Sequence, residues 1–183
     1  MIDKQIIFPE DEKDIELKAK LLREAWGNPN DNLQERGESW KDNCYHMGCL
    51  NSIVKLDDEY IWFIFWKDFN LNKEYIERTI GYQNLLQLLQ DSWISDPYKL
   101  FWIQGFYIKP NFRKLGIGIE LLSSLINQVK NIHWVWLLLD VDYELPQLIS
   151  WYKKQWFSEL SIYDRTSKDK IQTIKKVLLI KRN

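Results

Sequence analysis

The chain has 183 residues, of which 45% are hydrophobic and 28% are charged, a composition that suits one globular domain and excludes a disordered or collagen-like chain. Its 25 basic and 26 acidic residues leave a net charge of −1, so the composition lacks the basic excess that nucleic-acid binding requires. Two cysteines in a chain of this length cannot form a disulfide framework, which favours a reducing compartment.

The start of the chain is unlike a signal peptide. Met1 to Lys4 run into the acidic Glu10-Asp11-Glu12, whereas a signal peptide has basic and then apolar residues. No uncharged apolar stretch approaches the roughly 18 residues that a membrane helix requires. We therefore expect a cytoplasmic protein without a membrane span or a nucleic-acid partner, as a monomer or homodimer.

The first forty residues are expected to hold one strand and two helices. Gln5 to Phe8 is a short apolar run typical of an edge strand. Asp11 stands where a helix N-cap belongs, and apolar residues follow at helical spacing, namely Ile15, Ala19, Leu22 and Trp26. Gly27 to Asn30 ends that helix, and a second short helix is expected around Leu33 to Trp40.

The middle of the chain predicts a β-hairpin followed by a helical segment. Ser52 to Leu56 and Tyr60 to Trp66 are strand-like and are joined by a polar turn over residues 57–59. The second strand is apolar on both faces, as a buried central strand should be. Residues 73–93 have helical periodicity, with one apolar face made of Tyr82, Leu85, Leu86, Leu89 and Trp93.

The C-terminal half alternates strands with helices. Residues 100–108 form a long strand stopped by Pro110, and residues 117–129 form a helix with Leu121, Leu122, Leu125 and Val129 inward. Residues 133–141 form another apolar strand. Pro146 is placed for the first turn of a helix that carries Leu148, Ile149, Tyr152 and Trp156. Two strands, at 160–164 and 176–180, complete an α/β or α+β domain.

Two closely spaced glycines follow the strand over residues 100–108. Gly116 and Gly118 are expected to let the backbone bend sharply there and expose consecutive N–H groups. With the positive end of the helix dipole, those groups form an anion site suited to phosphate. Ile119 and Glu120 exclude a Walker loop, which needs Lys and then Ser or Thr, and Leu121 excludes the third small residue of a dinucleotide fingerprint.

The segment from Ile108 to Gly118 resembles the acyl-CoA pyrophosphate loop of the GNAT N-acetyltransferase superfamily, with Arg113, Gly116 and Gly118 at its motif positions. Downstream, residues 133–139 resemble the family's fifth strand, and residues 148–157 resemble the helix that follows it. The resemblance covers about residues 100–157. It departs from the family pattern where Trp156 replaces a glycine and where Leu145 replaces an asparagine that contacts the cofactor in many members.

The resemblance implies a single GNAT-like α/β (α+β) domain over residues 1–183. Its mixed, mostly antiparallel sheet would have about six to seven strands, splayed between the fourth and fifth and flanked by helices. Residues 1–98 would form the acceptor-side half with a helical insertion at 71–98, residues 99–157 the acyl-CoA-binding core, and residues 158–183 the C-terminal strands.

The implied activity is direct transfer of an acetyl or related acyl group from acyl-CoA to a primary amine on a small molecule or a peptide, without a metal. Longer-chain transfer to a peptide or protein side-chain amine, or a non-catalytic acyl-CoA-binding module, stays open. The implied cofactor-binding residues are Phe106, Tyr107, Ile108, Arg113, Lys114, Leu115, Gly116, Ile117 and Gly118. The backbone N–H groups of residues 106–108 would hold the thioester carbonyl and its developing oxyanion.

Tyr152 matches the family's tyrosine that protonates the departing thiolate. On spacing alone, the same residue is a core side chain of the stripe in its helix. The general base is left open among Gln104, Asp140 and Asp142.

Two other features have alternative interpretations. Cys44, His46 and Cys49 do not complete a zinc site, since His133 belongs to another strand, so no metal is expected. The segment 71–98 either covers a sheet edge or forms an apolar wall of the acyl or acceptor pocket, facing Trp26, Trp40 and residues 60–66.

Overall fold

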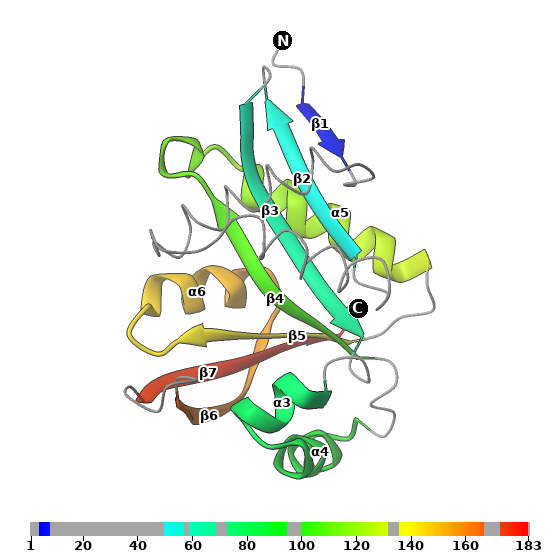
Figure 1. Cartoon of the computed structure of the whole chain (residues 1–183), viewed down its shortest axis with the longest axis vertical. Helices are drawn as coiled ribbons and strands as arrows, with labels where there is room; N and C mark the ends of the chain where they lie inside the picture. Colours follow the sequence, from blue (N-terminus) through cyan, green and yellow to red (C-terminus); the bar gives the residue numbers. More distant parts are fainter. Residues whose placement is uncertain are drawn as a thin grey trace. The chain divides into compact units, whose positions relative to one another are not determined.

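The computed structural model describes residues 4–7, 50–56, 59–68, 73–94, 100–131, 136–166 and 173–182. The elements in chain order are β1 (Lys4–Ile7), β2 (Leu50–Leu56), β3 (Glu59–Asp68), α3 (Lys73–Thr79), α4 (Tyr82–Asp91), β4 (Leu100–Ile108), the 3-10 helix η3 (Pro110–Phe112), α5 (Ile117–Asn131), β5 (Trp136–Asp142), α6 (Pro146–Lys154), β6 (Ser158–Thr166) and β7 (Thr173–Arg182), as Figure 1 labels them. The two helices expected within residues 11–40 lie outside the described residues.

The chain divides into two compact units, and β4 and α5 each contribute to both. The first unit comprises Met1–Lys67 and Gln104–Ser123, and the second comprises Asp68–Ile103 and Ser124–Asn183. In the first unit the strand order is β1-β2-β3-β4. β1 pairs with β2 from Lys4↔Leu56, and β2 pairs with β3 from Leu50↔Trp66, both antiparallel. The expected edge strand and the expected hairpin are therefore confirmed.

In the second unit the strand order is β4-β5-β7-β6. β4 and β5 are parallel, with a register that runs from Leu100↔Trp136 to Ile103↔Leu139. β7 pairs antiparallel with β5 on one side and with β6 on the other. The parallel register thus ends at Ile103, the residue at which this unit's share of β4 also ends.

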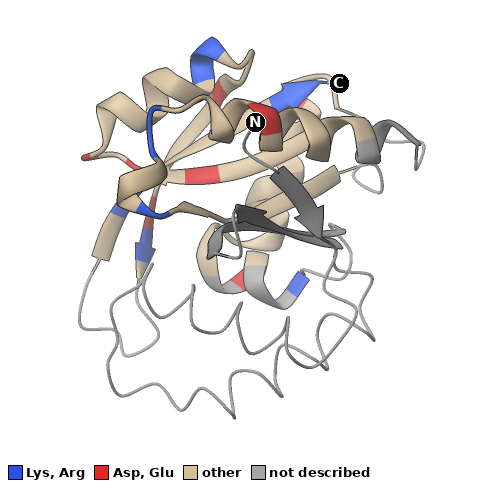
Figure 2. Cartoon of the chain, turned by 90° about the horizontal axis from the view of Figure 1, so that it is seen from above, with Lys and Arg blue, Asp and Glu red and all other residues tan. Residues whose placement is uncertain are grey.

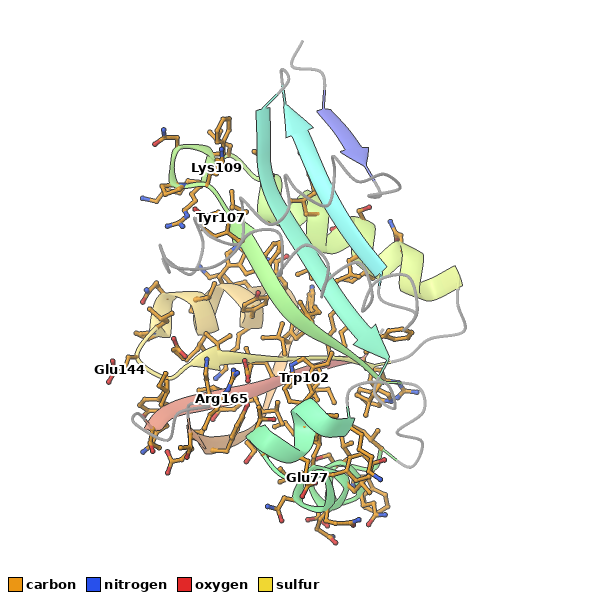
Figure 3. All side chains as sticks on the ribbon, in the orientation of Figure 1. Glu77, Trp102, Tyr107, Lys109, Glu144 and Arg165 are labelled. Atoms are coloured by element: carbon orange, nitrogen blue, oxygen red, sulfur yellow. The ribbon has the colours of Figure 1, made fainter. Side chains whose placement is uncertain are left out.

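One face of this second sheet packs against α3 and α4. Leu100 and Trp102 of β4, Leu138 of β5, and Leu178 and Ile180 of β7 form one buried cluster with apolar side chains of the two helices, namely Ile76, Ile80, Leu85, Leu89 and Ile94. Figure 3 labels Trp102, the largest fully buried side chain of the described residues. Because side chains alternate along a strand, the buried Leu137, Leu139 and Val141 point to the opposite face.

The helical segment at 73–93 is two helices, where the periodicity predicted one. Gly81 separates α3 from α4 with a φ of 83°, a left-handed conformation that a side chain disfavours. Leu85 and Leu89 are buried as expected. Trp93 is 94% exposed and does not belong to the apolar face, because α4 ends at Asp91 and Trp93 follows with a φ of 62°.

The remaining elements lie close to their predicted positions. β4 has the expected bounds, and α5 buries Leu121, Leu122 and Leu125. β6 and β7 extend the two predicted terminal strands by a few residues at each end. Along the residues that the structure describes, no helix combines the length and the apolar character needed to cross a membrane.

Candidate acyl-CoA site and the environment of Tyr152

In the first unit, β4 leads into a short braced loop. Pro110 begins η3, and the loop folds back on the strand because Arg113 Nε donates a hydrogen bond to the Ile108 carbonyl at 3.0 Å. The Arg113 guanidinium also lies 5.9 Å from the centre of the Tyr107 ring, within reach of a cation–π contact. Figure 3 labels Tyr107 on the strand and Lys109 at the start of the loop. Arg113 therefore has a structural role in shaping the loop, which the motif match alone did not indicate.

The backbone bends at Lys114 and Gly116, with φ values of 66° and 80°. A Cβ atom added at Gly116 would meet nothing within 4 Å, so glycine is favoured there by the backbone conformation and not by lack of space. Gly118 lies inside the first turn of α5. The expectation that both glycines supply the bend is thus wrong for Gly118, because a helical residue needs no left-handed φ.

The loop ends at the N-terminus of α5. The Gly116 carbonyl accepts the N–H groups of Ile119 at 3.0 Å and Glu120 at 3.3 Å, so the helical hydrogen bonds begin at Gly116. The first N–H groups of any helix lack an acceptor within the helix and carry the positive end of its dipole. A bend, an open position at Gly116 and a 15-residue helix are therefore features of a site that can bind an anion such as a phosphate group.

The predicted cofactor residues differ in what they can offer. Phe106, Tyr107 and Ile108 are half-buried on β4, whereas Lys114 and Leu115 are exposed in the loop. The Ile117 side chain is buried in the core. Ile117 can therefore contribute to a bound anion only through its backbone N–H.

In the second unit, α6 carries Tyr152 on its last turn, with 5% of the side chain exposed. The Tyr152 ring makes edge contacts with Trp151, at 4.8 Å between ring centres, and with Phe157, at 5.4 Å. Such aromatic pairs stabilise a packed side chain by about 0.5–1.5 kcal/mol beyond the burial of their area. The ring of Tyr152 is thus fixed by residues on both sides of the helix end.

The helix ends in a Schellman motif, which fixes Tyr152 further. Phe157 N–H donates to the Tyr152 carbonyl at 3.2 Å, and Trp156 N–H donates to the Lys153 carbonyl at 3.1 Å. The aromatic contact between Tyr152 and Phe157 is the apolar contact that accompanies this motif. Trp156 takes the left-handed position with a φ of 68°, where glycine is usual.

The stripe predicted for this helix is only partly confirmed. Tyr152 is buried and Ile149 is half-buried, but Leu148 is exposed and Trp156 is 83% exposed. Trp156 departs because α6 ends at Lys154, so its side chain leaves the helix at the cap.

Two effects raise the pKa of Tyr152 far above its usual value near 10. Burial disfavours the charged phenolate, and the negative charge of Asp140 adds to that effect. The phenol therefore keeps its proton throughout the neutral range. The same shift makes it a weaker acid, so proton transfer from the phenol to a thiolate is uphill.

Asp140 and Asp142 of β5, which the sequence alone does not distinguish, differ in exposure and in hydrogen-bond and ion-pair partners. Asp142 is 40% exposed, and its Oδ1 lies 2.5 Å from Lys176 Nζ on β7. Asp140 is only 12% exposed, and its Oδ2 accepts a hydrogen bond from Tyr163 Oη on β6 at 2.5 Å. Arg165 Nη1 lies 4.0 Å from the same oxygen. Asp142 is therefore neutralised by a close cation, whereas Asp140 is held mainly by a neutral donor.

Some predicted candidates cannot be assigned a place. The Gln104 side chain, Cys44, His46, Cys49 and His133 lie outside the described residues. Within the described ranges, no three His, Cys, Asp or Glu side chains gather as a group that could hold a metal ion. The nine predicted cofactor residues belong to the first unit and Tyr152 to the second.

The described elements carry the features of an acyl-CoA-dependent acetyltransferase: a strand, a bent loop and a helix N-terminus, followed by a parallel strand and a helix with a buried tyrosine. Residues 21–157 match the Acetyltransferase (GNAT) family, so the chain belongs to that family. Members of this family use acetyl-CoA. The expected α/β fold of the GNAT type is confirmed.

Solved structures with this fold include two enzymes named for a ribosomal-protein acceptor. The ribosomal-protein-alanine N-acetyltransferase from Brucella melitensis has a TM-score of 0.70 at 14% identity, covering 98% of this chain and 99% of that one. The ribosomal-protein-S18-alanine N-acetyltransferase from Escherichia coli has a TM-score of 0.67 at 14% identity, with coverages of 98% and 94%.

A third similar structure contains the cofactor. It is yncA from Salmonella typhimurium with acetyl-CoA, which has a TM-score of 0.68 at 12% identity and covers 98% of this chain and 94% of that one. At such identities these likenesses show the fold alone. No curated protein sequence matches this chain significantly.

Proposed function

We propose that this protein is an N-acyltransferase that moves an acetyl group from acetyl-CoA to a primary amine by direct transfer. The observation that carries the proposal is the turn from β4 into α5, where Gly116 bends the backbone at the N-terminus of a long helix. Such a terminus binds phosphate groups through its free N–H donors and its dipole. The family match over residues 21–157 supports acyl transfer as the use of this anion site.

The cofactor residues have distinct roles in this proposal. Arg113 braces the loop through the Ile108 carbonyl, so that the N–H groups at 117 and 118 face the diphosphate. The basic side chain of Lys114 is exposed beside them and adds positive charge. The backbone of Phe106 to Ile108 holds the thioester carbonyl and stabilises its oxyanion.

Tyr152 is proposed as the general acid. The neutral acceptor amine attacks the thioester carbon, the carbon–sulfur bond breaks, and the acylated nitrogen releases one proton to solvent; the leaving thiolate takes the phenol proton, which solvent then replaces. Its packing between Trp151 and Phe157 supports this role, because a general acid has to be held in one position.

The acceptor is a primary amine, and the segment 71–98 is proposed as an apolar wall of its site or of the acyl site. Tyr82 and Leu86 support this idea in part. Both side chains pack against the core cluster of α3 and α4, but they are only half-buried, so part of each stays exposed and can line a site. Charged residues occur as short, separate blue and red segments along the described elements in Figure 2. The segment 71–98 has few acidic residues (Glu74, Glu77, Asp91 and Asp96), which favours a hydrophobic acyl chain or an apolar acceptor over a polycationic one.

A screen of products tests the activity directly. The protein is incubated with acetyl-CoA and longer acyl-CoAs against small amines, lysine peptides and a peptide with N-terminal alanine, and products are identified by mass spectrometry. The alanine peptide is included because two similar structures are named for that acceptor. An acylated amine formed by wild type and lost in a Tyr152→Phe variant supports the proposal. Tight CoA binding without any product across the panel would establish a non-catalytic binding module instead.

A further inference from the structure

Two large apolar side chains are exposed where β4 leads into α5. Leu115 in the loop is 62% exposed, and Ile119 in the first turn of α5 is 46% exposed. Other apolar residues of the helix, such as Ile117 and Leu121, are buried. Leu115 and Ile119 are thus exceptions, and in the chain they flank Gly116, where the backbone bends.

The period of α5 explains why the core cannot cover Ile119. An α-helix turns by about 100° per residue, so Ile119 lies on the side opposite to Ile117 and Leu121. Leu115 precedes the helix, between Lys114 and Gly116, which both have a positive φ. Neither exposed side chain belongs to the buried core of the described residues. Their apolar character therefore does not serve the packing of the first unit.

The same stretch carries a local positive charge. Three basic residues lie within residues 109–114, whereas no acidic residue occurs from position 104 to position 119. Arg113 stays charged while its Nε–H donates to the Ile108 carbonyl, and Lys114 is exposed. Figure 3 labels Lys109 at the start of this loop. These basic and exposed apolar side chains are called the loop surface below: Lys109, Arg113, Lys114, Leu115 and Ile119.

The two kinds of side chain on the loop surface suit different parts of a ligand. Phosphate binds backbone N–H groups and cations, and it gains nothing from the alkyl groups of Leu115 and Ile119. An apolar centre with a charged rim is typical of a protein–protein interface. The apolar side chains come from both the loop and α5, with the cations before them in the chain, which suits the face of a protein better than a single purine ring. The charge favours a partner whose face is acidic.

The proposed chemistry narrows the choice of partner. In the proposed function the acyl group arrives as a thioester on a phosphopantetheine arm, whose phosphate binds at the start of α5. Such an arm continues into the diphosphate and adenosine of CoA, or it ends in one phosphate attached to a serine of a carrier protein. In the second case the surface of the carrier lies only one serine side chain away from the phosphate. It must then contact the residues around the anion site, which form the loop surface.

We propose that the loop surface docks an acidic carrier protein that presents the acyl group as a thioester on a serine-linked phosphopantetheine arm. Leu115 and Ile119 contact apolar side chains of the carrier, and the three basic residues face its carboxylates. The phosphate of the arm occupies the anion site at the start of α5. This inference rests on the proposed acyl transfer and concerns only the molecule that brings the acyl group.

Binding of a purified acyl carrier protein tests the proposal without an acceptor. The carrier bears its phosphopantetheine arm and a fluorescent label, and its Kd for the full chain is measured by fluorescence anisotropy. Ile119→Ser should weaken binding about tenfold, because it removes an apolar contact. Lys114→Glu should weaken it at least as much, because it places a negative charge against an acidic face. The affinity of Ile119→Ser for acetyl-CoA, measured by calorimetry, should equal that of wild type.

Two substitutions in the second unit are matched controls. Ile162 on β6 is 44% exposed, so Ile162→Ser removes a similar apolar side chain elsewhere. Lys175→Glu reverses the charge of an exposed lysine on β7. Both should leave the Kd for the carrier unchanged, and circular dichroism checks that every variant is folded.

Three results would overturn the docking proposal. The first is a wild-type protein that does not bind the carrier. The second is an equal loss of carrier binding in Ile119→Ser and Ile162→Ser, which would mean that Ile119 has no special part in docking. The third is a loss of acetyl-CoA affinity in Ile119→Ser, which would assign this side chain to the nucleotide.

Product formation, measured separately, reports on the proposed function. If wild type acylates an amine from acetyl-CoA but does not bind the carrier, the proposed function stands and the docking proposal fails. If neither acetyl-CoA nor the acetylated carrier gives a product with any amine of the panel, the proposed function itself fails. The two proposals are therefore refuted by different measurements.

Discussion

Replacing Trp156 by glycine should stabilise the protein, although it removes a large aromatic side chain. Trp156 has a φ of 68° and is 83% exposed, so it combines an unfavourable backbone conformation with little burial. A residue with a Cβ loses about 1–2 kcal/mol in the left-handed region, which glycine does not. Glycine gains more conformational freedom in the unfolded chain, which costs about 0.5–1 kcal/mol.

The difference predicts a net gain of roughly 0.5–1 kcal/mol in the free energy of unfolding. For a chain of this size, that corresponds to a rise in the melting temperature of about 1–4 °C. The Schellman hydrogen bonds from residues 156 and 157 use backbone atoms, so the substitution keeps them. Urea unfolding followed by circular dichroism measures the change.

A matched control is Ser150→Gly, at an exposed position inside α6. There glycine relieves no strain and should destabilise by a few tenths of a kcal/mol. Trp93→Gly, at the corresponding cap of α4 with a φ of 62°, should behave like Trp156→Gly. If Trp156→Gly lowers stability as much as Ser150→Gly does, the argument from backbone strain is refuted.

Three further predictions concern the site. Acetyl-CoA at 100 times its dissociation constant should raise the free energy of unfolding of wild type by about 2.7 kcal/mol, seen as a higher melting temperature. Gly118→Leu should abolish that rise, because a side chain in the first turn of α5 crowds the diphosphate. No stabilisation of wild type would contradict the cofactor assignment. Tyr152→Phe should keep acetyl-CoA affinity in calorimetry and lower kcat by about 10- to 1000-fold, whereas an unchanged kcat would leave Tyr152 as a core residue. Leu86→Glu should shift the preference among acyl-CoAs of increasing length, measured as kcat/KM, and identical preferences would make the segment 71–98 a scaffold.

Local patterns predicted those boundaries at which a residue such as proline starts or stops an element. Pro110 follows the end of β4, and Pro146 begins α6. The errors at Trp93 and Trp156 have one cause: both helices end in a left-handed cap that lacks glycine. A cap formed by tryptophan gives no stop signal in the sequence, so each tryptophan was assigned to the apolar face of a longer helix.

At the candidate site, contacts between residues far apart in the sequence likewise could not be predicted. The loop residues could be predicted as a candidate site because strand, bend and helix follow one another within residues 100–118. Asp140 and Asp142 could not be distinguished from the sequence, because their partners Tyr163 and Lys176 come from strands placed by the order β5-β7-β6. The brace from Arg113 to the Ile108 carbonyl likewise depends on how η3 folds the loop back.

The raised pKa of Tyr152 also predicts how stability depends on alkaline pH. The unfolded phenol ionises near pH 10, while the folded phenol ionises well above that because of burial and Asp140. Below about pH 10 both states are protonated, and the stabilising contribution of this phenol is fully present. Above it the unfolded chain binds fewer protons, so stability falls with rising pH until the folded phenol ionises too.

At pH 11 this one group should cost about 1.4 kcal/mol relative to pH 8, a slope that Tyr152→Phe lacks. The test compares wild type with Tyr152→Phe by urea unfolding at both pH values, because the difference between the two proteins cancels the titration of the other residues. Tyr143→Phe, which removes an exposed tyrosine, is the matched control. Parallel stability curves for wild type and Tyr152→Phe between pH 8 and pH 11 would mean that the folded phenol ionises as it does in water, and that its buried environment does not control its proton.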